Sequence, residues 1–222
     1  MEQTPAHGQH NPDLLQLIPK LSKHIIEIGC SSGALAREFK KINPTCNYFG
    51  VDIDASYTLL ANRYCDHTSA INIEDSSEDF FIDNKIRDCW IFGDTLEHFQ
   101  DPWKILQKIR NVIPDEGCVV ACIPNAQHWS LQVKLSIGDF RYQDSGLLDK
   151  THLRWFTRQT IIELFTETGF NIIEGSPRIF NEPAREKFLP LIGDLAKLAG
   201  FDPVIAINDS LPLQFVIKAI PN

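Results

Sequence analysis

The chain has 222 residues, of which 43% are apolar, and its formal net charge is −8. This length fits one large domain or two small ones, with a core that needs neither a metal nor a disulfide to hold it. The negative charge argues against a general nucleic-acid binder or acidic-membrane binder, because such proteins need a positive field to neutralise phosphates.

Six cysteines are spread along the chain without CxxC pairs and without the dense spacing of a secreted disulfide scaffold. We therefore expect reduced thiols and a cytoplasmic protein. The first thirteen residues lack the basic and apolar regions of a signal peptide. No apolar stretch approaches the roughly 20 residues that span a bilayer, so we expect no transmembrane segment.

Apolar runs of strand length alternate with helical patterns, which is typical of a parallel sheet with crossover helices. In chain order, helical patterns are predicted at residues 12–18, 34–41, 55–65, 102–114, 158–168 and 182–198. Strands are predicted at residues 24–28, 48–53, 69–73, 88–93, 118–123, 171–174 and 213–220. The pattern predicts an α/β fold.

Two segments interrupt this alternation. Residues 126–158 form a predicted long loop rich in aromatic side chains, and loops of this length in a compact domain are usually functional. Residues 175–211 form a predicted helical insertion. We predict a single domain over residues 1–222, in which the loop and the insertion cap the site.

The strongest motif joins a buried strand to a glycine turn, from Gly29 to Gly33, at the start of a helix. Glycine lets the backbone approach a ligand closely, and the helix N-terminus offers free N–H groups. About twenty residues later, Asp52 ends the second strand, where it can accept the two hydroxyls of a ribose. The motif indicates a ligand that contains a nucleoside, with an ordinary strand-to-helix turn as the alternative.

The turn favours S-adenosylmethionine over NAD. A dinucleotide site needs GxGxxG, whereas here Ser31 stands at the middle position and no third glycine is in register. Glu27, just before the turn, would repel a pyrophosphate but can receive the ammonium group of a methionine moiety.

Residues 92–103, 123–130 and 146–157 together resemble class I S-adenosylmethionine-dependent methyltransferases, a broad family that includes quinone-pathway O-methyltransferases. The chain is also similar to methyltransferase domains found beside bacterial sugar and polysaccharide glycosyltransferases. The resemblance runs from about Leu14 to Ile173. The helical insertion after Gly175 resembles no segment that we can name.

The resemblance implies a Rossmann-like fold with a seven-stranded, mostly parallel sheet in the order 3-2-1-4-5-7-6, the last strand antiparallel, and helices on both faces. It implies S-adenosylmethionine as cofactor and S-adenosylhomocysteine as product. The residues that it assigns to the cofactor are Glu27, Gly29, Cys30, Ser31, Gly33, Asp52, Ile53, Ile73, Glu74, Asp94 and Leu96. Two positions depart from the family pattern: Ser31 replaces the usual glycine, and Asn72 stands where an aspartate is common.

The acceptor side needs a base if the acceptor is a hydroxyl, because its proton must leave. We predict His152 on the long loop as that base, with a histidine that only ties the loop by hydrogen bonds as the alternative. His98 and His128 are weaker candidates for the same role. The residues predicted to bind the substrate are Arg141, Tyr142 and Arg154.

Asp94, Glu97, His98 and His152 resemble a set that holds Mg²⁺ in some small-RNA 2′-O-methyltransferases and quinone O-methyltransferases. Imidazole is a less usual ligand for Mg²⁺, and Asp94 can serve the cofactor directly. We therefore predict no metal.

The leading hypothesis is methyl transfer from S-adenosylmethionine to a hydroxyl or amine of a sugar or polysaccharide-type acceptor. The alternatives are a small phenol or quinone-like acceptor, a catalytically silent cofactor-binding module and, more remotely, an NAD-dependent oxidoreductase. Expected partners are the small-molecule or glycan acceptor and no nucleic acid, with a glycosyltransferase or a second copy of the chain as candidate protein partners.

Overall fold

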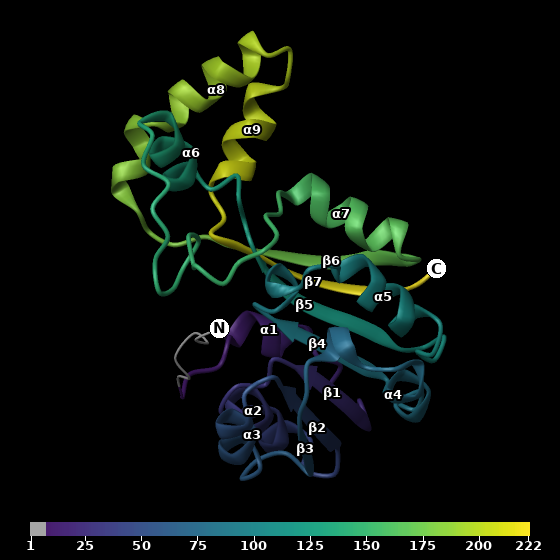
Figure 1. Cartoon of the computed structure of the whole chain (residues 1–222). Coiled ribbons are helices and arrows are strands. Elements are labelled where there is room, and N and C mark those ends of the chain that lie inside the picture. Colours follow the sequence, from purple (N-terminus) through teal and green to yellow (C-terminus); the bar gives the residue numbers. More distant parts are fainter. Residues whose placement is uncertain (1–7) are drawn as a thin grey trace.

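A seven-stranded sheet forms the centre of the computed structural model, which describes residues 8–222 (Figure 1). Its strand order is β3-β2-β1-β4-β5-β7-β6. The strands are β1 His24–Ile28, β2 Asn47–Asp52, β3 His67–Ala70, β4 Cys89–Gly93, β5 Cys118–Pro124, β6 Phe170–Arg178 and β7 Gln214–Pro221. The pairs among β1 to β5 are parallel, and β7 runs antiparallel to both β5 and β6. The predicted fold class is confirmed.

Helices cover both faces of the sheet and extend beyond it. The α-helices are α1 Pro12–Leu17, α2 Ala34–Ile42, α3 Ala55–Ala61, α4 Glu78–Asp83, α5 Pro102–Arg110, α6 Trp129–Ser136, α7 Arg158–Glu167, α8 Leu189–Leu198 and α9 Pro203–Ser210. Short 3₁₀ helices are η1 Ile73–Asp75, η2 Leu96–His98 and η3 Pro183–Lys187. No helix within residues 8–222 is long and apolar enough to cross a membrane.

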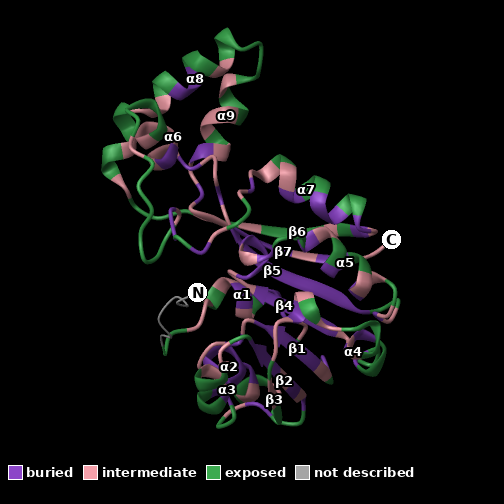
Figure 2. Cartoon of the chain, viewed as in Figure 1, coloured by how far each residue is buried: buried purple, intermediate pink, exposed green. Residues whose placement is uncertain are grey.

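Two apolar cores lie on opposite faces of the sheet, because successive strand residues point to opposite sides. On β4, Trp90 and Phe92 enter the core shared with α4, α5 and α7, whereas Cys89 and Ile91 enter the core shared with α1, α2 and α3. Both faces are covered, which explains why β4 and β5 are continuous apolar runs. Buried residues accordingly concentrate in the sheet and the helix faces against it (Figure 2). All six cysteines are buried free thiols.

The third strand lies earlier in the chain than predicted. β3 ends at Ala70, and Ile73, which we placed in the strand, begins η1 instead. The side chain of Asn72 accepts a hydrogen bond from the Glu74 amide at 3.1 Å, which starts this turn. A local side chain to backbone bond thus ends the extended conformation. The helix α4 was not predicted, and α3 ends at Ala61 rather than at residue 65.

The two late segments form a helical lobe beyond one end of the sheet (Figure 1). The predicted loop 126–158 contains α6, and the insertion contains η3 and two helices, of which α9 was not predicted. β6 runs to Arg178, so the chain leaves the sheet after that residue rather than at 175. Glu182 joins the two segments, since it accepts hydrogen bonds from the Trp129 ring at 2.9 Å and pairs with His128 at 3.2 Å.

Alanine substitutions at Gly33 and Gly138 test how tightly the turn after β1 is packed, because Gly33 lies in this turn and Gly138 lies in open space. Both have positive φ, but a Cβ on Gly33 would lie 2.9 Å from the Ala61 Cα, whereas a Cβ on Gly138 would meet nothing within 4 Å. Gly33→Ala should therefore lower the free energy of unfolding by about 2 to 4 kcal/mol, from backbone strain and overpacking together. Gly138→Ala should cost only the strain, about 1 kcal/mol. Urea unfolding followed by circular dichroism measures both, and equal losses would contradict the packing argument.

Candidate active site

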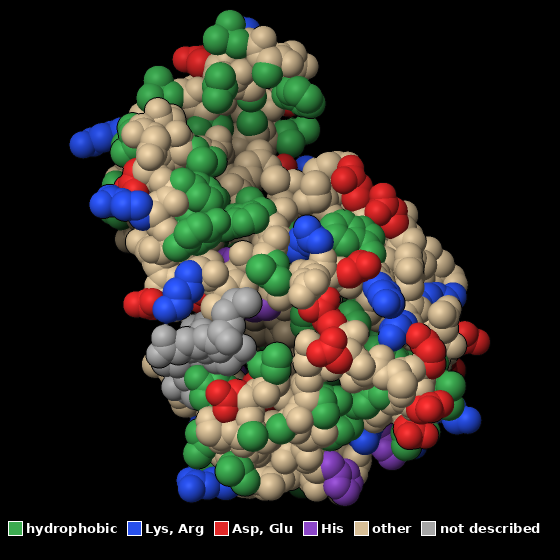
Figure 3. All heavy atoms as spheres, in the orientation of Figure 1, with side chains coloured by type: hydrophobic (Ala, Val, Ile, Leu, Met, Phe, Trp, Pro, Cys, Tyr) green, Lys and Arg blue, Asp and Glu red, His purple; other side chains and the backbone are tan. Residues whose placement is uncertain are grey.

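A cavity of about 570 Å³ opens at the carboxyl ends of β1, β2 and β4. Its walls come from these strand ends, from residues 9–14 and from the loop residues 145–153. In the space-filling view the surface is hollowed between the helical lobe and the sheet, while acidic side chains gather over α4, α5 and α7 (Figure 3). Ligands in open α/β sheets bind at this edge, and the volume lies in the range of small-molecule sites.

The turn after β1 forms one wall of the cavity and is held against two other strands. The amides of Gly29 and Cys30 both donate to the Val51 carbonyl of β2, at 2.8 and 3.0 Å. Gly29 has a φ of 78°, and a Cβ there would lie 2.5 Å from the Thr95 hydroxyl oxygen after β4. Only glycine fits this close approach.

Asp52 lies at the end of β2 with its carboxylate fixed by the backbone. Its two oxygens accept hydrogen bonds from the Ser31 amide at 2.8 Å and from the Asp54 amide at 3.0 Å. Burial raises its pKa above the ordinary value, although both amides oppose this shift. The carboxylate lines the cavity with acceptor capacity left for hydroxyl donors.

Glu27 is a buried acid at the end of the cavity nearest the glycine turn. Burial raises its pKa to about 8, and the nearby charge of Asp52 adds to this shift. The buried Tyr48 hydroxyl donates to its carboxylate at 2.8 Å, which opposes the shift. Without a ligand the group is therefore mostly protonated at pH 7, and a cationic group beside it would favour the charged form.

Ser31 and Asp94 are the non-glycine residues of 8–222 with positive φ, at 46° and 54°. Both line the cavity. Asp94 is fixed by its neighbours, because its carboxylate accepts hydrogen bonds from the Gln214 side-chain amide and from the Cys122 thiol. Arg178 in turn donates to the Gln214 side chain. Backbone strain of this kind clusters at functional sites, where the surrounding structure holds it.

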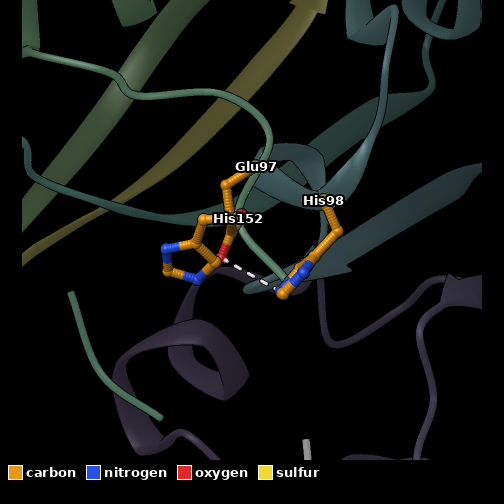
Figure 4. A group of neighbouring side chains, drawn as sticks. All are labelled: Glu97, His98 and His152. Carbon is orange, nitrogen blue, oxygen red and sulfur yellow. Dashed lines mark ion pairs between the residues drawn. The ribbon is translucent and has the colours of Figure 1, made fainter. Parts of the chain in front are cut away.

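Glu97, His98 and His152 line the cavity together, with their side chains close to one another (Figure 4). The Glu97 Oε1 lies 4.0 Å from His98 Nε2 and 3.9 Å from His152 Nε2. Glu97 is buried, and neither of its carboxylate oxygens has a hydrogen-bond partner within the described residues. Burial, followed by the charge of Asp94, raises the pKa of Glu97 well above its ordinary value. This shift favours the protonated, neutral form of the Glu97 carboxyl group.

The two imidazoles are also neutral near pH 7. Burial lowers the pKa of both, and the neighbouring His98 lowers that of His152 further. The Nδ1 of His98 lies 3.2 Å from the Thr151 carbonyl oxygen, and the Thr151 hydroxyl donates to Asp149 at 2.7 Å. Since the carbonyl accepts only, Nδ1 carries the proton of His98, which leaves Nε2 free to accept one.

The ligand atoms of Glu97, His98 and His152 all lie within 4.8 Å of one another, so the three could hold a metal ion. Asp94 is not in this group. One carboxylate and two imidazoles suit a transition-metal ion better than Mg²⁺, which prefers an oxygen shell. The structure therefore brings together three of the four residues that were considered as a magnesium site from the sequence, without Asp94.

Three of the predicted site residues lie outside the cavity lining because they are packed elsewhere. Gly33 lies behind the turn against Ala61, and Leu96 is fully buried in the core. His128 is also buried, and its two ring nitrogens pair with Ser130 and Glu182. These contacts connect the start of α6 to the insertion, so His128 has a structural role in this arrangement.

The three residues predicted to bind the substrate also lie outside the lining. Arg141 is exposed and forms two hydrogen bonds to Asp139, at 2.7 and 3.0 Å. Tyr142 is exposed beside Phe140. Arg154 donates to the backbone carbonyl of Gln100 on the outside of the loop. The insertion 179–211 contributes nothing to the lining either, so the cap over the cavity comes from the loop alone.

Several lining residues were not anticipated from the sequence, among them Asn11, Leu14, Thr95, Thr151 and Gln214. Thr95 and Thr151 lie within residues 92–103 and 146–157, two of the segments that resemble methyltransferases. Their place in these segments was the only sequence signal for them. Asn11 and Leu14 belong to the segment before β1, and Gln214 follows Asp94 by 120 residues. No local pattern links these positions to the site.

The sheet order and the ligand cavity at its carboxyl edge define a Rossmann-like protein of the class I methyltransferase type. A family model described as a methyltransferase domain matches residues 6–174. The chain belongs to this family and is an S-adenosylmethionine-dependent methyltransferase. The NAD-dependent alternative is therefore wrong.

Solved structures share this fold at low sequence identity. The plantazolicin methyltransferase BpumL in complex with SAH is 16% identical with a TM-score of 0.58, over 95% of this chain and 80% of that one. A putative S-adenosylmethionine-dependent methyltransferase from Listeria monocytogenes is 13% identical with a TM-score of 0.61, over 95% and 97%. Magnesium protoporphyrin IX methyltransferase (ChlM) from Synechocystis PCC 6803 with bound SAH is 11% identical with a TM-score of 0.60, over 95% and 81%. Among curated proteins, no sequence relative matches the chain.

Glu27 should make cofactor affinity depend on pH. A bound ammonium group requires the ionised carboxylate, whereas the free group holds a proton up to its pKa of about 8. Binding therefore releases a proton, and the affinity for S-adenosylhomocysteine should rise between pH 6 and 7.5, by at most about tenfold per pH unit. Titration calorimetry at several pH values measures this rise. Glu27→Gln should bind more weakly and lose the pH dependence, while Asp54→Asn, at an acid outside the lining, should keep it. A flat profile for the natural protein would contradict the assignment.

Proposed function

We propose that this enzyme methylates a hydroxyl group of a sugar or polysaccharide-type acceptor, with His152 as the general base. The observation that carries the proposal is the pair of neutral imidazoles that line the same cavity as Glu27 and Asp52. A hydroxyl acceptor needs a group that takes its proton near neutral pH, and a neutral histidine meets that need.

The cofactor, when bound, supplies an electrophilic methyl group on a sulfonium. We assign Glu27 to its ammonium group and Asp52 to the ribose hydroxyls, because each carboxylate faces the cavity at the matching end. Ile73 and Glu74 would flank the adenine. The Glu74 carboxylate accepts from the amides of Gln100 and Asp101, at 3.1 and 2.9 Å, and is held in place by them.

His152 is the preferred base for three reasons. Its side chain is only 7% exposed, so water competes little for it. Its ring lies edge-on to the His98 and Trp155 rings, at centroid distances of 4.9 and 5.9 Å, and these contacts orient the imidazole. Burial lowers the pKa of the ring, and the opposing charge of Asp149 does not reverse this shift. The imidazole therefore stays unprotonated at pH 7 and can accept the acceptor's proton as the oxygen attacks the methyl group.

The polar lining at this end supports a hydrophilic acceptor. Ser145, Thr151 and Gln214 line the same cavity as the two histidines and add polar groups to its surface. The fold itself does not set the acceptor, since similar structures include a plantazolicin methyltransferase and a magnesium protoporphyrin IX methyltransferase. The sequence similarity to methyltransferase domains beside glycosyltransferases favours a sugar, and we propose a glycosyltransferase partner and a cytoplasmic location on the same ground.

The acceptor class is tested with a panel of simple sugars, nucleotide sugars, catechols and quinols, with isotopically labelled S-adenosylmethionine as methyl donor. Incorporation into sugars is expected, because the polar lining can bind several hydroxyls at once. Turnover confined to catechols and quinols would show that the acceptor is phenolic. The same assay on Asp52→Ala controls for cofactor-dependent transfer.

His152→Ala should lower kcat by roughly 10² to 10⁴ with nearly unchanged cofactor affinity, because the residue acts in the chemical step. Since burial lowers the pKa of His152, the rate should stay level near pH 7 and fall only below about pH 6.5, where the imidazole becomes protonated. His67→Ala, at an exposed histidine on β3, is the matched control.

EDTA should leave the rate unchanged if His152 acts as a plain base. Loss of turnover in EDTA, with an equal defect in Glu97→Ala, would assign Glu97, His98 and His152 to a metal ion instead. Full kcat in His152→Ala would refute both mechanisms.

A further inference from the structure

A second cavity of about 170 Å³ adjoins the acceptor end of the first. Leu147 and Leu213 line both cavities, so the two cavities adjoin at these two half-buried side chains. The far side of the second cavity is formed by α6, through Leu131 and Lys134. The second cavity thus lies between the loop, α6 and the chain before β7, and it adjoins the cavity that His152 lines.

This second cavity combines apolar walls with one cation. Leu131 and Leu148 are buried and supply the apolar surface. Lys134 is half-buried at the edge, and no carboxylate within residues 8–222 lies at ion-pair distance from it. Asp139, the acid that senses the charge of Lys134, is already bound by two nitrogens of Arg141. The charge of Lys134 acts on Asp139 without an ion pair and therefore remains available to a ligand in the cavity.

We propose that the acceptor carries an anionic group, a phosphate or a carboxylate, which binds in this second cavity against Lys134 while the hydroxyl to be methylated lies at His152. The inference rests on the proposed function, because it names the acceptor of the same site. Leu147 and Leu213 pack on the carbon skeleton between the two polar ends of the acceptor.

The size and chemistry of the cavity fit this class of group. Its volume equals that of about five to six liquid waters, which is room for a phosphate or a carboxylate with part of a ring. Lysine binds such groups as a point charge, and partial burial strengthens the interaction because the local dielectric is lower than in water. A neutral group in the same place would leave the lysine partly desolvated without a partner.

The test measures binding to the full-length protein saturated with S-adenosylhomocysteine, so that the cofactor end is filled. Glucose is compared with glucose 1-phosphate and glucuronate, and catechol with 3,4-dihydroxybenzoate, by titration calorimetry. Each anionic probe should bind at least about tenfold more tightly than its neutral counterpart, the range of a charge-assisted hydrogen bond. The phosphate and carboxylate arms show which anion is preferred.

Lys134→Met should abolish the preference for the anionic probes, and Lys134→Arg should retain it. Methionine keeps the length of the side chain and suits a helix about as well as lysine, so α6 should remain folded. Lys150→Met removes a lysine of the same loop that pairs with Asp144 outside both cavities, and it should keep the preference. Unchanged S-adenosylhomocysteine affinity confirms that each variant is folded.

Equal affinity for anionic and neutral probes, a preference that survives Lys134→Met, or no binding of any anionic probe would each overturn the inference. Two other outcomes distinguish failure of this inference from failure of the proposed function. Methylation of glucose without an anion preference would retain the sugar acceptor and remove the Lys134 site. A Lys134-dependent preference found only in the catechol arm would retain the Lys134 site and remove the sugar.

Discussion

The hydrogen bond from the Ser31 amide to the Asp52 carboxylate joins the turn after β1 to the end of β2. Together with the bonds from Gly29 and Cys30 to Val51, it brings two parallel strands to the same edge and fixes their last residues there. Parallel strands in register deliver their carboxyl ends to one side of the sheet. Every cofactor group that we assign depends on this edge, and the strained backbone of Ser31 is tolerated because these bonds hold it.

Four of the carboxyl groups that line the cavity differ in their surroundings, and these surroundings decide how each is oriented and how easily it ionises. Asp52 accepts from two backbone amides, and Asp94 accepts from Gln214, so both are held in fixed directions. Glu27 is buried beside a tyrosine and ionises readily only when a cation arrives. Glu97 is buried without a hydrogen-bond partner in the described chain, and its raised pKa favours the neutral form beside two neutral imidazoles. The charge of Asp149 opposes the lowered pKa of both imidazoles without reversing it, so both can accept a proton near pH 7.

The sheet and the segments added to it have different tasks in this protein. The sheet and its edge form the cofactor site in a manner common to this class, and function varies through the segments added to such folds. Here the segment 126–158 supplies His152, one wall of the first cavity and most of the second cavity. The insertion 179–211 supports that segment through Glu182 and does not line the first cavity.

The sequence by itself determined the elements whose signals are local. The apolar strand β1 and the glycine turn that follows it were predicted in place, because both have their signal in consecutive residues. The positive φ of Gly29 came from the structure. The acid at the end of β2 followed from the same turn, and the sheet order followed from the resemblance. S-adenosylmethionine as the cofactor was deduced from Glu27 and the missing third glycine, and the family match agrees.

Only the tertiary structure decided how distant segments meet. The helix α6 begins without a side-chain capping bond, so no local signal marked its start. His128 was a plausible base until Glu182, 54 residues later, was found to bind its ring. Arg154 turned outward because the Gln100 carbonyl lies within its reach, and Gln214 reached Asp94 across 120 residues. Periodicity records which face of an element is buried, but the partner of a polar side chain is set by the packing of elements far apart in the chain.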